Sequence, residues 1–468
     1  MADTVNGTGA GRHAVVVGAS LAGLLAAHVL AEHAERVTIV ERDRLPEGPE
    51  PRAGVPQSRH THVLIPGGQS AYETLLPGFT EELREHGAPR VGTPDDIVQW
   101  QAGRWFRRTE ETAHFVTPTR PLFEWLVRRR VLAGSRIEVV DGTETVGLIG
   151  DAARVRGVLV RERGPAATGR EPRPLTADLV VDASGRGTRA ADWLTRIGAE
   201  PPAEEVLETG LAYASRIYRT DGEAPGGTDA RGQFVVPNPG QTFGAVVLPI
   251  EDDRWTVTLW GLRGAEPPLD DRGFTEYADR LPHPVVRRWL DAAKADTSAL
   301  AYRTTANVRR RYDRPGRRPA GFLATGDAQC VFNPIYGQGM TVAALSALAL
   351  RDALGERRRT PTTRRVQRAM SAVVRQAWDI SAGSDKNMPT ASGSAARSTA
   401  ADRISGWYLG RVEARAPGDP EVSRAFRDVL YLVRPVTSLF APRIARAVLF
   451  GPVRPAPSEP PARREGTG

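Results

Sequence analysis

Only one cysteine, Cys330, occurs among the 468 residues of the chain. A lone cysteine excludes an intramolecular disulfide, a CxxC redox pair and a zinc or iron–sulfur site held by cysteines. Redox chemistry in this chain would therefore require a bound cofactor. We expect Cys330 to be a small buried apolar residue, and the sequence shows no cluster of metal ligands.

Lysine is also scarce, because only Lys294 and Lys386 are lysines among the 63 basic residues. The arginines are scattered among 55 acidic residues and form no basic block. The charge pattern therefore does not favour a nucleic-acid partner.

A secretory signal and long apolar runs are lacking as well. The first 13 residues are polar and do not have the cationic start and apolar core of a signal, which predicts a cytoplasmic protein. No window approaches the ~18 uninterrupted apolar residues that span a bilayer. The best candidate, residues 429–450, contains Arg434, Arg443 and Arg446. We expect these C-terminal helices to pack on the body of the protein, with membrane association through them as the less favoured alternative.

A dinucleotide fingerprint begins the ordered part of the sequence. Residues 14–17 predict a strand, an Ala/Leu-rich helix follows a glycine turn, and residues 37–40 predict a second strand. Glycine permits the tight turn, and the free N–H groups of the helix start bind pyrophosphate. An acidic residue after the second strand suits ribose hydroxyls. The candidate binding residues here are Gly18, Ser20, Ala22, Gly23, Glu41 and Arg42, with Ser20 where the pattern usually has its second glycine.

The middle of the chain predicts several further elements. A ligand-contacting loop is expected over 43–68, a helix over 69–86, two strands within 97–116 and a helix over 119–132. Short strands at 137–140, 155–161 and 179–181 lead to the segment Asp182-Ala-Ser-Gly185. Residues 205–265 predict a β-meander that interrupts the nucleotide-binding pattern, and this block is the natural substrate module.

A second motif follows the strand predicted at 322–325. Gly326 and Asp327 place a carboxylate at a strand end, and a Pro/Gly loop then opens a long helix. Such a helix start faces an electron-rich group, and a flavin ring that gains negative charge on reduction is one such partner. The candidate residues are Pro334, Tyr336, Gly337, Gly339 and Met340.

In order and spacing, these three segments resemble the class A FAD-dependent monooxygenases over about residues 12–360. The loop from Gly54 to His62, taken with the segment from Gly326 to Met340, is closer still to actinomycete flavin epoxidases of the polyether type, and more distantly resembles squalene epoxidase. The resemblance implies an α/β fold, with a Rossmann-like FAD-binding domain (βαβ, a GxGxxG variant), an inserted β-sheet substrate domain and C-terminal helices.

The resemblance also implies roles for individual residues. Glu41 would bind the adenosine ribose, Arg52 or Arg120 the pyrophosphate side, and Asp327 the ribityl chain. Asp182 would lie near the pyrophosphate, Gln57 would contribute from the loop, and Pro334 to Gly339 would pack on the flavin ring. The candidate catalytic residues are Pro334, Tyr336, Gly337 and His62.

Two assignments keep an alternative. Arg120 is either a cofactor ligand or a helix-start arginine in a surface ion pair. His60 and His62 either line the flavin face or bond the backbone.

The implied activity is oxygen activation as a flavin C4a-hydroperoxide and epoxidation of a C=C bond in an apolar polyketide or terpenoid intermediate. Electrons would come from NAD(P)H, either by transient docking or through a separate flavin reductase. Aromatic hydroxylation and FAD-linked alkene reduction on the same scaffold are the alternatives. A halogenase ranks low, because no lysine occurs in the first 293 residues. A non-catalytic flavin- or lipid-binding protein is the alternative from another class.

The predicted organisation is discontinuous. It comprises a FAD-binding domain in three parts (12–95, 119–204 and 301–360), substrate-domain strands (96–118), a substrate-binding β-sheet domain (205–300), a C-terminal helical region (361–452) and disordered tails (1–11 and 453–468).

Overall fold

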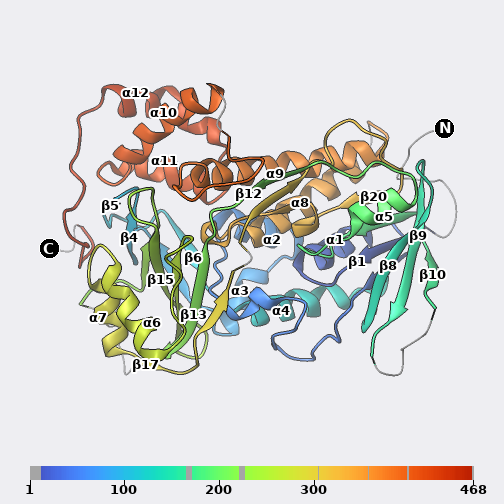
Figure 1. The fold of residues 1–468 in the computed structure, drawn as a ribbon, viewed down its shortest axis with the longest axis horizontal. Coiled ribbons are helices and arrows are strands. Elements are labelled where there is room, and N and C mark those ends of the chain that lie inside the picture. The colour runs from blue at the N-terminus through green and yellow to red at the C-terminus, as the bar shows by residue number, and fades with distance from the viewer. Residues whose placement is uncertain are drawn as a thin grey trace.

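The computed structural model describes residues 12–164, 171–220, 227–303, 305–356, 358–397 and 400–465. It has two lobes that lie side by side along the long axis, with helices α10 to α12 above one of them (Figure 1). The tail expected at residues 1–11 lies outside the described residues.

A parallel five-stranded sheet forms the first lobe. Its strand order is β20-β11-β1-β2-β7, with bounds Phe322–Ala324, Leu179–Asp182, His13–Val17, Arg36–Val40 and Ile137–Val140. The central strand β1 pairs in parallel with both β2 and β11. It is buried on both faces, and after His13 its residues are apolar without alternation, as such a strand requires.

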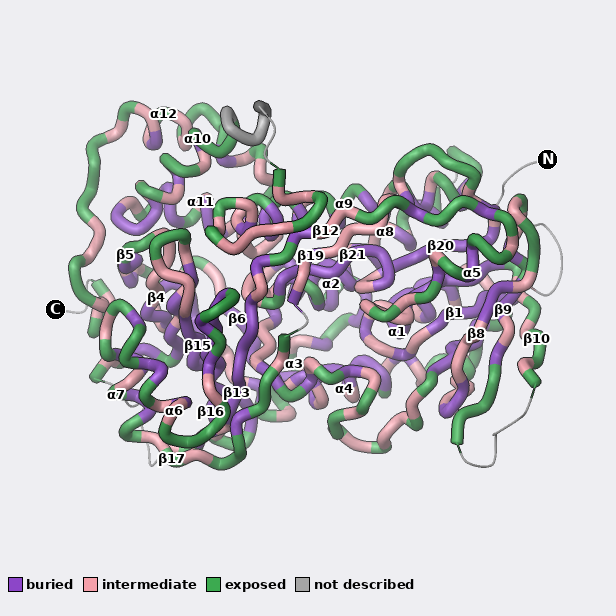
Figure 2. Tube along the Cα trace, in the orientation of Figure 1, coloured by how far each residue is buried: buried purple, intermediate pink, exposed green. Residues whose placement is uncertain are grey.

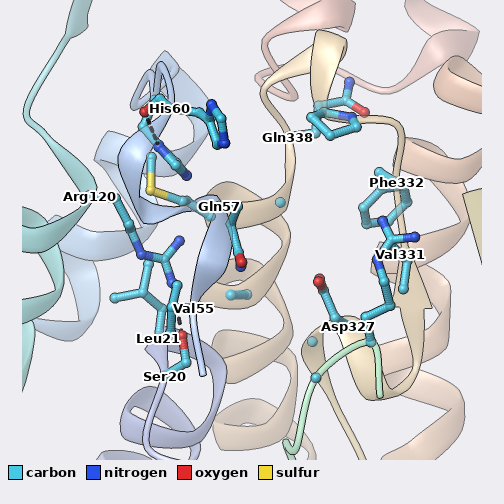
Figure 3. Close-up of a pocket in the computed structure, with 18 of the residues that line it drawn as sticks. Ser20, Leu21, Val55, Gln57, His60, Arg120, Asp327, Val331, Phe332 and Gln338 are labelled. Atoms are coloured by element: carbon cyan, nitrogen blue, oxygen red, sulfur yellow. Dashed lines mark hydrogen bonds between the residues drawn. The ribbon is translucent and has the colours of Figure 1, made fainter. Parts of the chain in front are cut away.

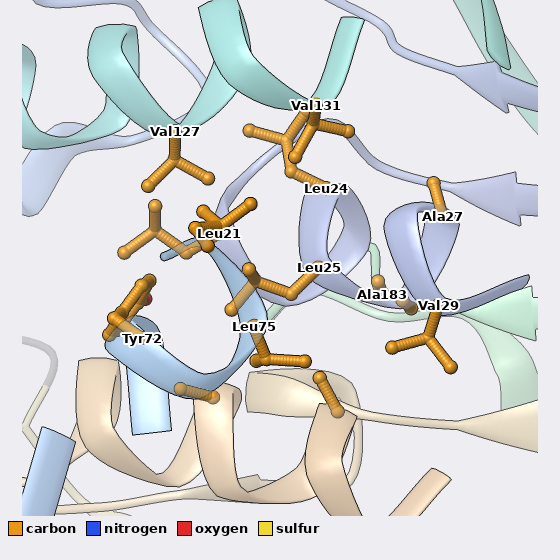
Figure 4. Close-up of a cluster of buried hydrophobic side chains, with 14 of the residues drawn as sticks. Leu21, Leu24, Leu25, Ala27, Val29, Tyr72, Leu75, Val127, Val131 and Ala183 are labelled. Carbon is orange, nitrogen blue, oxygen red and sulfur yellow. The ribbon is translucent and has the colours of Figure 1, made fainter. Parts of the chain in front are cut away.

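Helix α1 (Leu21–Leu30) covers one face of this sheet and is almost wholly buried. It packs against α4 (Arg120–Leu132) and α8 (Gly339–Gly355). Figure 4 shows Leu24 and Leu25 of α1 between Val127 and Val131 on one side and Leu75 on the other. The other face is covered by α5 (Ala190–Arg196) and by an antiparallel sheet of β8 (Thr143–Gly150), β9 (Val155–Glu162) and β10 (Arg173–Thr176).

The second lobe is built on an eight-stranded sheet. Its strands are β17 (Lys294–Ala295), β13 (Ala212–Arg219), β16 (Arg254–Gly261), β15 (Phe243–Ile250), β14 (Gly232–Val235), β4 (Ile97–Gln101) and β5 (Arg104–Trp105), with β18 (Leu300–Tyr302) paired to β13. Helices α6 (Asp271–Tyr277) and α7 (Val285–Ala292) cover one face, where Trp289 is buried against Trp255. The opposite face looks toward the first lobe. Figure 2 shows the buried strands of both lobes.

Smaller elements join the lobes. Strand β3 (Arg90–Thr93) pairs with β6 (Ala113–Val116), and β19 (Asn307–Arg310) lies between β12 (Glu204–Leu207) and β21 (Cys330–Val331). Helix α9 (Thr363–Asp385) packs along α8 and contacts β20, so it belongs to the first lobe rather than to a separate C-terminal unit. The remaining helices are α10 (Ala400–Arg415), α11 (Pro420–Leu430) and α12 (Pro442–Phe450). Among the described residues, no helix is both long and apolar enough to span a membrane.

Two sequence predictions fail in this architecture. The helix expected over 69–86 is two helices, α2 (Pro66–Leu75) and α3 (Phe79–Glu85), because Pro77 and Gly78 break it and Gly78 has a positive φ of 79°. The C-terminal tail expected to be disordered from residue 453 is docked as far as the structure describes it, to residue 465. Hydrogen bonds, and not the burial of apolar surface, hold the tail. Asp229 N donates to Ala462 O (3.2 Å), and Glu465 N donates to Arg108 O (2.8 Å).

The turn between β1 and α1 tolerates no side chain at Gly23, because a Cβ there would lie 1.9 Å from the carbonyl oxygen of Gly18. We predict that Gly23→Ala destabilises the protein strongly, since backbone must move. Gly383, an exposed residue within α9, has open space around its Cβ position. Gly383→Ala should therefore be neutral or stabilising by up to ~1 kcal/mol. Chemical denaturation of the two variants tests this, and a Gly23→Ala protein as stable as the Gly383→Ala protein would contradict the packing described.

Candidate functional site

A cavity of about 700 Å³ lies between the two lobes. Figure 3 shows its two sides: Ser20, Val55, Gln57, His60 and Arg120 lie on one wall, and Asp327, Val331, Phe332 and Gln338 face them from the other. All the sequence-predicted site residues line the cavity except Gly23 and Asp182. The fold therefore brings the three motifs to one place.

The β1–α1 turn is fixed by a buried carboxylate at the end of β2. Glu41 is 4% exposed, and one of its oxygens accepts from Ala19 N (2.7 Å) while the other accepts from Asp43 N (2.9 Å). Gly18 adopts φ 104°, and its N–H donates to Val40 O (2.8 Å). These contacts hold the turn open at the cavity wall, with Glu41 and Arg42 beside it.

Two arginines of this wall share one buried carboxylate. Arg52 Nε lies 2.8 Å from Glu124, and Arg120 Nη2 lies 3.1 Å from the same side chain. Ser20 Oγ joins the cluster, because it accepts from Arg120 (2.9 Å) and donates to Glu124 (3.0 Å). The two guanidinium groups hold the pKa of Glu124 below its usual value despite its burial. Arg120 thus forms a buried ion pair at the cavity wall, not the surface ion pair of the sequence alternative.

Arg52 retains unused bonding capacity. It also pairs with Asp43 (3.2 Å) and lies 3.3 Å from Glu41, yet its buried Nη2 atom has no hydrogen-bond partner among the described residues. A buried unpaired guanidinium N–H is costly, so an acceptor on a ligand in the cavity would complete it.

The two acidic residues at strand ends differ in their surroundings. Asp182, fully buried, accepts from Ser184 N (2.9 Å), Ser184 Oγ (2.6 Å) and Thr188 Oγ1, so its carboxylate orders the loop 183–189 beneath the cavity wall. Asp327 lines the cavity, and burial raises its pKa. Arg310 ties the two loops together, because its guanidinium donates to the carbonyls of Asp327 (3.1 Å) and Arg186 (3.4 Å).

The Pro/Gly loop before α8 forms the opposite wall. Asn333 caps a short 3₁₀ turn at Pro334–Tyr336, and Gly337 follows in the left-handed region with φ 63°. The start of α8 at Gly339 then faces the cavity. Pro334, Tyr336, Gly337 and Met340 all line it.

Both histidines of the 54–62 loop are held by hydrogen bonds, with His60 buried and His62 half-buried. His60 Nδ1 lies 2.8 Å from Ser215 Oγ, and its ring packs edge-on against Tyr213 with centroids 4.8 Å apart. His62 Nδ1 lies 2.9 Å from His60 O. Burial lowers the pKa of His60 to about 4, and burial together with Arg120 lowers the pKa of His62 to about 3. Both rings therefore line the cavity and bond protein groups at once, which joins the two alternatives from the sequence.

The wall contributed by the second lobe is apolar and aromatic. Its lining residues are Ile97, Phe115, Leu211, Tyr213, Phe234, Val236, Val246, Trp260 and Tyr302, with Gln99, Gln101 and Thr258 as the polar members. Leu430 and Tyr431, at the end of α11, also line the cavity. Tyr431 is fixed there by Thr93 (3.1 Å between hydroxyl oxygens) and by an edge contact with Phe115.

Sequence reasoning missed Glu124, Asp385 and Arg310. Glu124 carries a weak signal, because it lies four residues after Arg120 on the predicted helix. Asp385 and Arg310 carry none, since their partners are distant in sequence. Cys330 is buried, as expected, and the described residues contain no cluster of potential metal ligands.

The three motifs, brought together at one cavity, are those of a protein that binds FAD. The FAD binding domain family matches residues 12–366, and the chain belongs to it. Protein Rv3254 of Mycobacterium tuberculosis is 38% identical over 353 residues, covering 74% of this chain and 73% of that protein. The 6-methylpretetramide 4-monooxygenase of Streptomyces rimosus is 27% identical over 367 residues, covering 74% of this chain and 76% of that enzyme.

Solved structures share the fold. A p-nitrophenol 4-monooxygenase from Pseudomonas putida superposes with a TM-score of 0.63 at 16% identity, covering 90% of this chain and 98% of that one. A flavin-dependent halogenase, CmlS, superposes with a TM-score of 0.62 at 18% identity, covering 91% and 78%. The mixed α/β FAD-binding fold predicted from the sequence is thereby confirmed.

The lowered pKa of His60 predicts a pH dependence of stability. Its pKa is about 4 in the folded protein and 6.5 in an unfolded chain, so the unfolded state binds more protons between these values. Stability is therefore lost as pH falls below 6.5, by about 2 kcal/mol per such histidine at pH 5. The variant His60→Gln should lose less stability than the wild type between pH 7 and pH 5, measured by urea denaturation. Equal losses in the two proteins would contradict the assigned burial.

Proposed function

We propose that the chain is an FAD-dependent monooxygenase that epoxidises a C=C bond of an apolar polyketide or terpenoid intermediate. The observation that carries the proposal is one continuous cavity, with a dinucleotide-type turn on one side and an apolar, aromatic wall on the other.

The residues present fit FAD. The unpaired Nη2 of Arg52 suits an anionic or hydroxyl oxygen, and the β1–α1 turn approaches Ala183 too closely for a side chain at Gly18. In the bound state we assign Glu41 to the adenosine ribose, Arg52 and the start of α1 to the pyrophosphate side, and Asp327 to the ribityl chain. The loop from Pro334 to Gly339 is assigned to the flavin ring. Asp182 acts on the pyrophosphate side through the loop that it orders.

Reduced FAD, when bound, supplies O₂ activation and the transfer of one oxygen atom. The chain's own residues then have three tasks. The sheet wall binds and orients an apolar chain, and Leu430 and Tyr431 exclude water at the open end. The loop at Pro334–Gly337 sets the position of the flavin ring relative to the C=C bond of the substrate.

The protonation chemistry of the wall favours an alkene over a phenol. Among the described residues, the lining contributed by the second lobe holds no carboxylate, lysine or histidine. Its tyrosines stay protonated near neutral pH, because burial raises the pKa of Tyr213 and of Tyr302, so neither can accept a proton from the substrate. Epoxidation requires no proton to be removed from the substrate, whereas hydroxylation of a phenol is assisted by a base.

Aromatic hydroxylation is the second candidate, and a chain of hydroxyl groups favours it. His60 contacts Ser215, Ser215 lies 2.6 Å from Thr258, and Thr258 lies 2.7 Å from Thr61. Such a chain could carry a phenolic proton to His60. The similarity to the Streptomyces and Pseudomonas monooxygenases also supports this reading.

We further propose NAD(P)H as the electron source. The sequence contains one dinucleotide fingerprint, which we assign to FAD, so NAD(P)H would either dock transiently or act through a separate flavin reductase. The substrate is a small apolar molecule, and the chain acts in antibiotic or other secondary metabolism in the cytoplasm.

FAD binding should depend on Asp327. Removing a charged hydrogen-bond acceptor costs ~1.5–3 kcal/mol, so Asp327→Ala should bind FAD about 10- to 100-fold more weakly in a fluorescence titration of the apoprotein. Asp192→Ala, which changes an exposed carboxylate of α5, is the matched control and should bind FAD like the wild type. An unchanged affinity in Asp327→Ala would remove the assigned role.

The reaction is tested with ¹⁸O₂, NADPH and a flavin reductase. Two substrates of similar carbon skeleton are offered, a terpenoid polyene and a polycyclic phenol. We expect one ¹⁸O atom in an epoxide of the polyene, the other oxygen leaving as water while NADPH is oxidised. Labelled product from the phenol alone would transfer the assignment to hydroxylation, and a saturated product without label would indicate a reductase. FAD binding without any product would support the non-catalytic alternative.

A further inference from the structure

We propose that Asp385, at the end of α9, is a positioning residue that holds the cavity loop at residues 333–337 in the shape required by the flavin ring. This inference rests on the proposed binding of FAD. It concerns a residue outside every motif that predicted the cofactor site.

The location of Asp385 is unfavourable unless the side chain has partners. It is 2% exposed, and it is the last residue of a 23-residue helix. A helix C-terminus carries partial negative charge, which repels a carboxylate, and burial removes its hydration. Burial accordingly raises the pKa of Asp385. Something must compensate for placing a carboxyl group there.

Three side chains supply the compensation, and two of them belong to the cavity loop. Oδ2 accepts from Asn333 Nδ2 (2.9 Å) and from Asn307 Nδ2 (2.7 Å), and Oδ1 accepts from Tyr336 OH (2.8 Å). Asn307 adds a second link to the loop, because its Oδ1 accepts from Asn333 N (2.8 Å) and from Ser381 Oγ (2.6 Å). The carboxyl group therefore connects α9 and β19 to both ends of the loop's short turn.

Beyond these bonds, the loop is held by its own turn and by the packing of Ile335 on an apolar cluster. Pro334 is exposed, while Ile335, Tyr336 and Gly337 are half-buried, and all four line the cavity. Within the turn, Asn333 Oδ1 accepts from Ile335 N (3.2 Å). The bonds to Asp385 therefore set the position of Tyr336, and with it the wall against which we place the flavin ring.

The proposal is specific about mechanism, because hydrogen-bond geometry and not charge holds the loop. An asparagine at position 385 can still accept from both amides through its oxygen, and its NH₂ can donate to the phenol oxygen of Tyr336. An alanine can do neither. The conservative variant should therefore rescue what the alanine variant loses.

The test compares Asp385→Ala with Asp385→Asn in the full-length holoenzyme. The matched control is Asp379→Ala, which removes an exposed carboxylate from the same helix. We expect Asp385→Ala to change the visible circular dichroism of the bound flavin and to lower kcat by about 10- to 100-fold, with KM for the substrate nearly unchanged, since the flavin ring is displaced relative to the bound substrate. Asp385→Asn should restore the dichroism band and most of kcat, and Asp379→Ala should match the wild type.

An unchanged flavin band in Asp385→Ala would overturn the proposal, as would an Asp385→Asn protein as impaired as the alanine variant. If Asp385→Ala does not fold, Tyr336→Phe breaks the same link from the loop side, and its flavin band must shift in the same direction. The dichroism readout requires only bound FAD. A wild-type protein that binds FAD but oxidises no substrate would therefore refute the proposed reaction and still test this inference.

Discussion

The close approach of backbone at the β1–α1 turn is the constraint on which the site depends. Gly18 must adopt a left-handed conformation, and the lack of a side chain at Gly23 allows α1 to pack directly against the carbonyl of Gly18. Glu41, which follows the neighbouring strand β2, then fixes the turn by accepting a hydrogen bond from Ala19 N. β1 is the central strand of its sheet, and the three motifs follow the carboxyl ends of β1, β11 and β20. A changed backbone conformation at this turn would therefore displace the place where the three motifs meet.

The electrostatics of the first wall follow from this turn. Ser20, at the start of α1, lies against Arg120 and Glu124 of α4, and Glu124 also pairs with Arg52 from the long loop. A carboxylate buried with two arginines orients both guanidinium groups, at the cost of desolvating three charges. The result is a preformed, ion-paired wall in which one N–H group of Arg52 is left for a ligand. The opposite wall is set in the same way, by a buried carboxyl group at the end of α9.

Local sequence signals predicted the parts whose cause is local. Strand, glycine turn, helix and acidic residue lie within 30 positions, and backbone geometry alone relates them, so Gly18 and Glu41 could be placed without a structure. The same holds for Gly326 and Asp327. The partners of Arg52 and of Tyr336 could not be placed, because Glu124 and Asp385 meet them only after distant helices have packed. The docked tail was missed for a related reason: its contacts are backbone and arginine hydrogen bonds, which leave no apolar pattern.

The most direct measurement of the central claim is the partition of oxygen in a single turnover. The flavin of the holoenzyme is reduced once, with no excess of NAD(P)H. The reduced enzyme is then mixed with O₂ and a terpenoid polyene and assayed for epoxide and for hydrogen peroxide. The proposed epoxidation at the apolar wall of the cavity predicts close to one epoxide per reduced flavin and little peroxide. Peroxide as the sole product from both the polyene and a matched phenol would contradict the account.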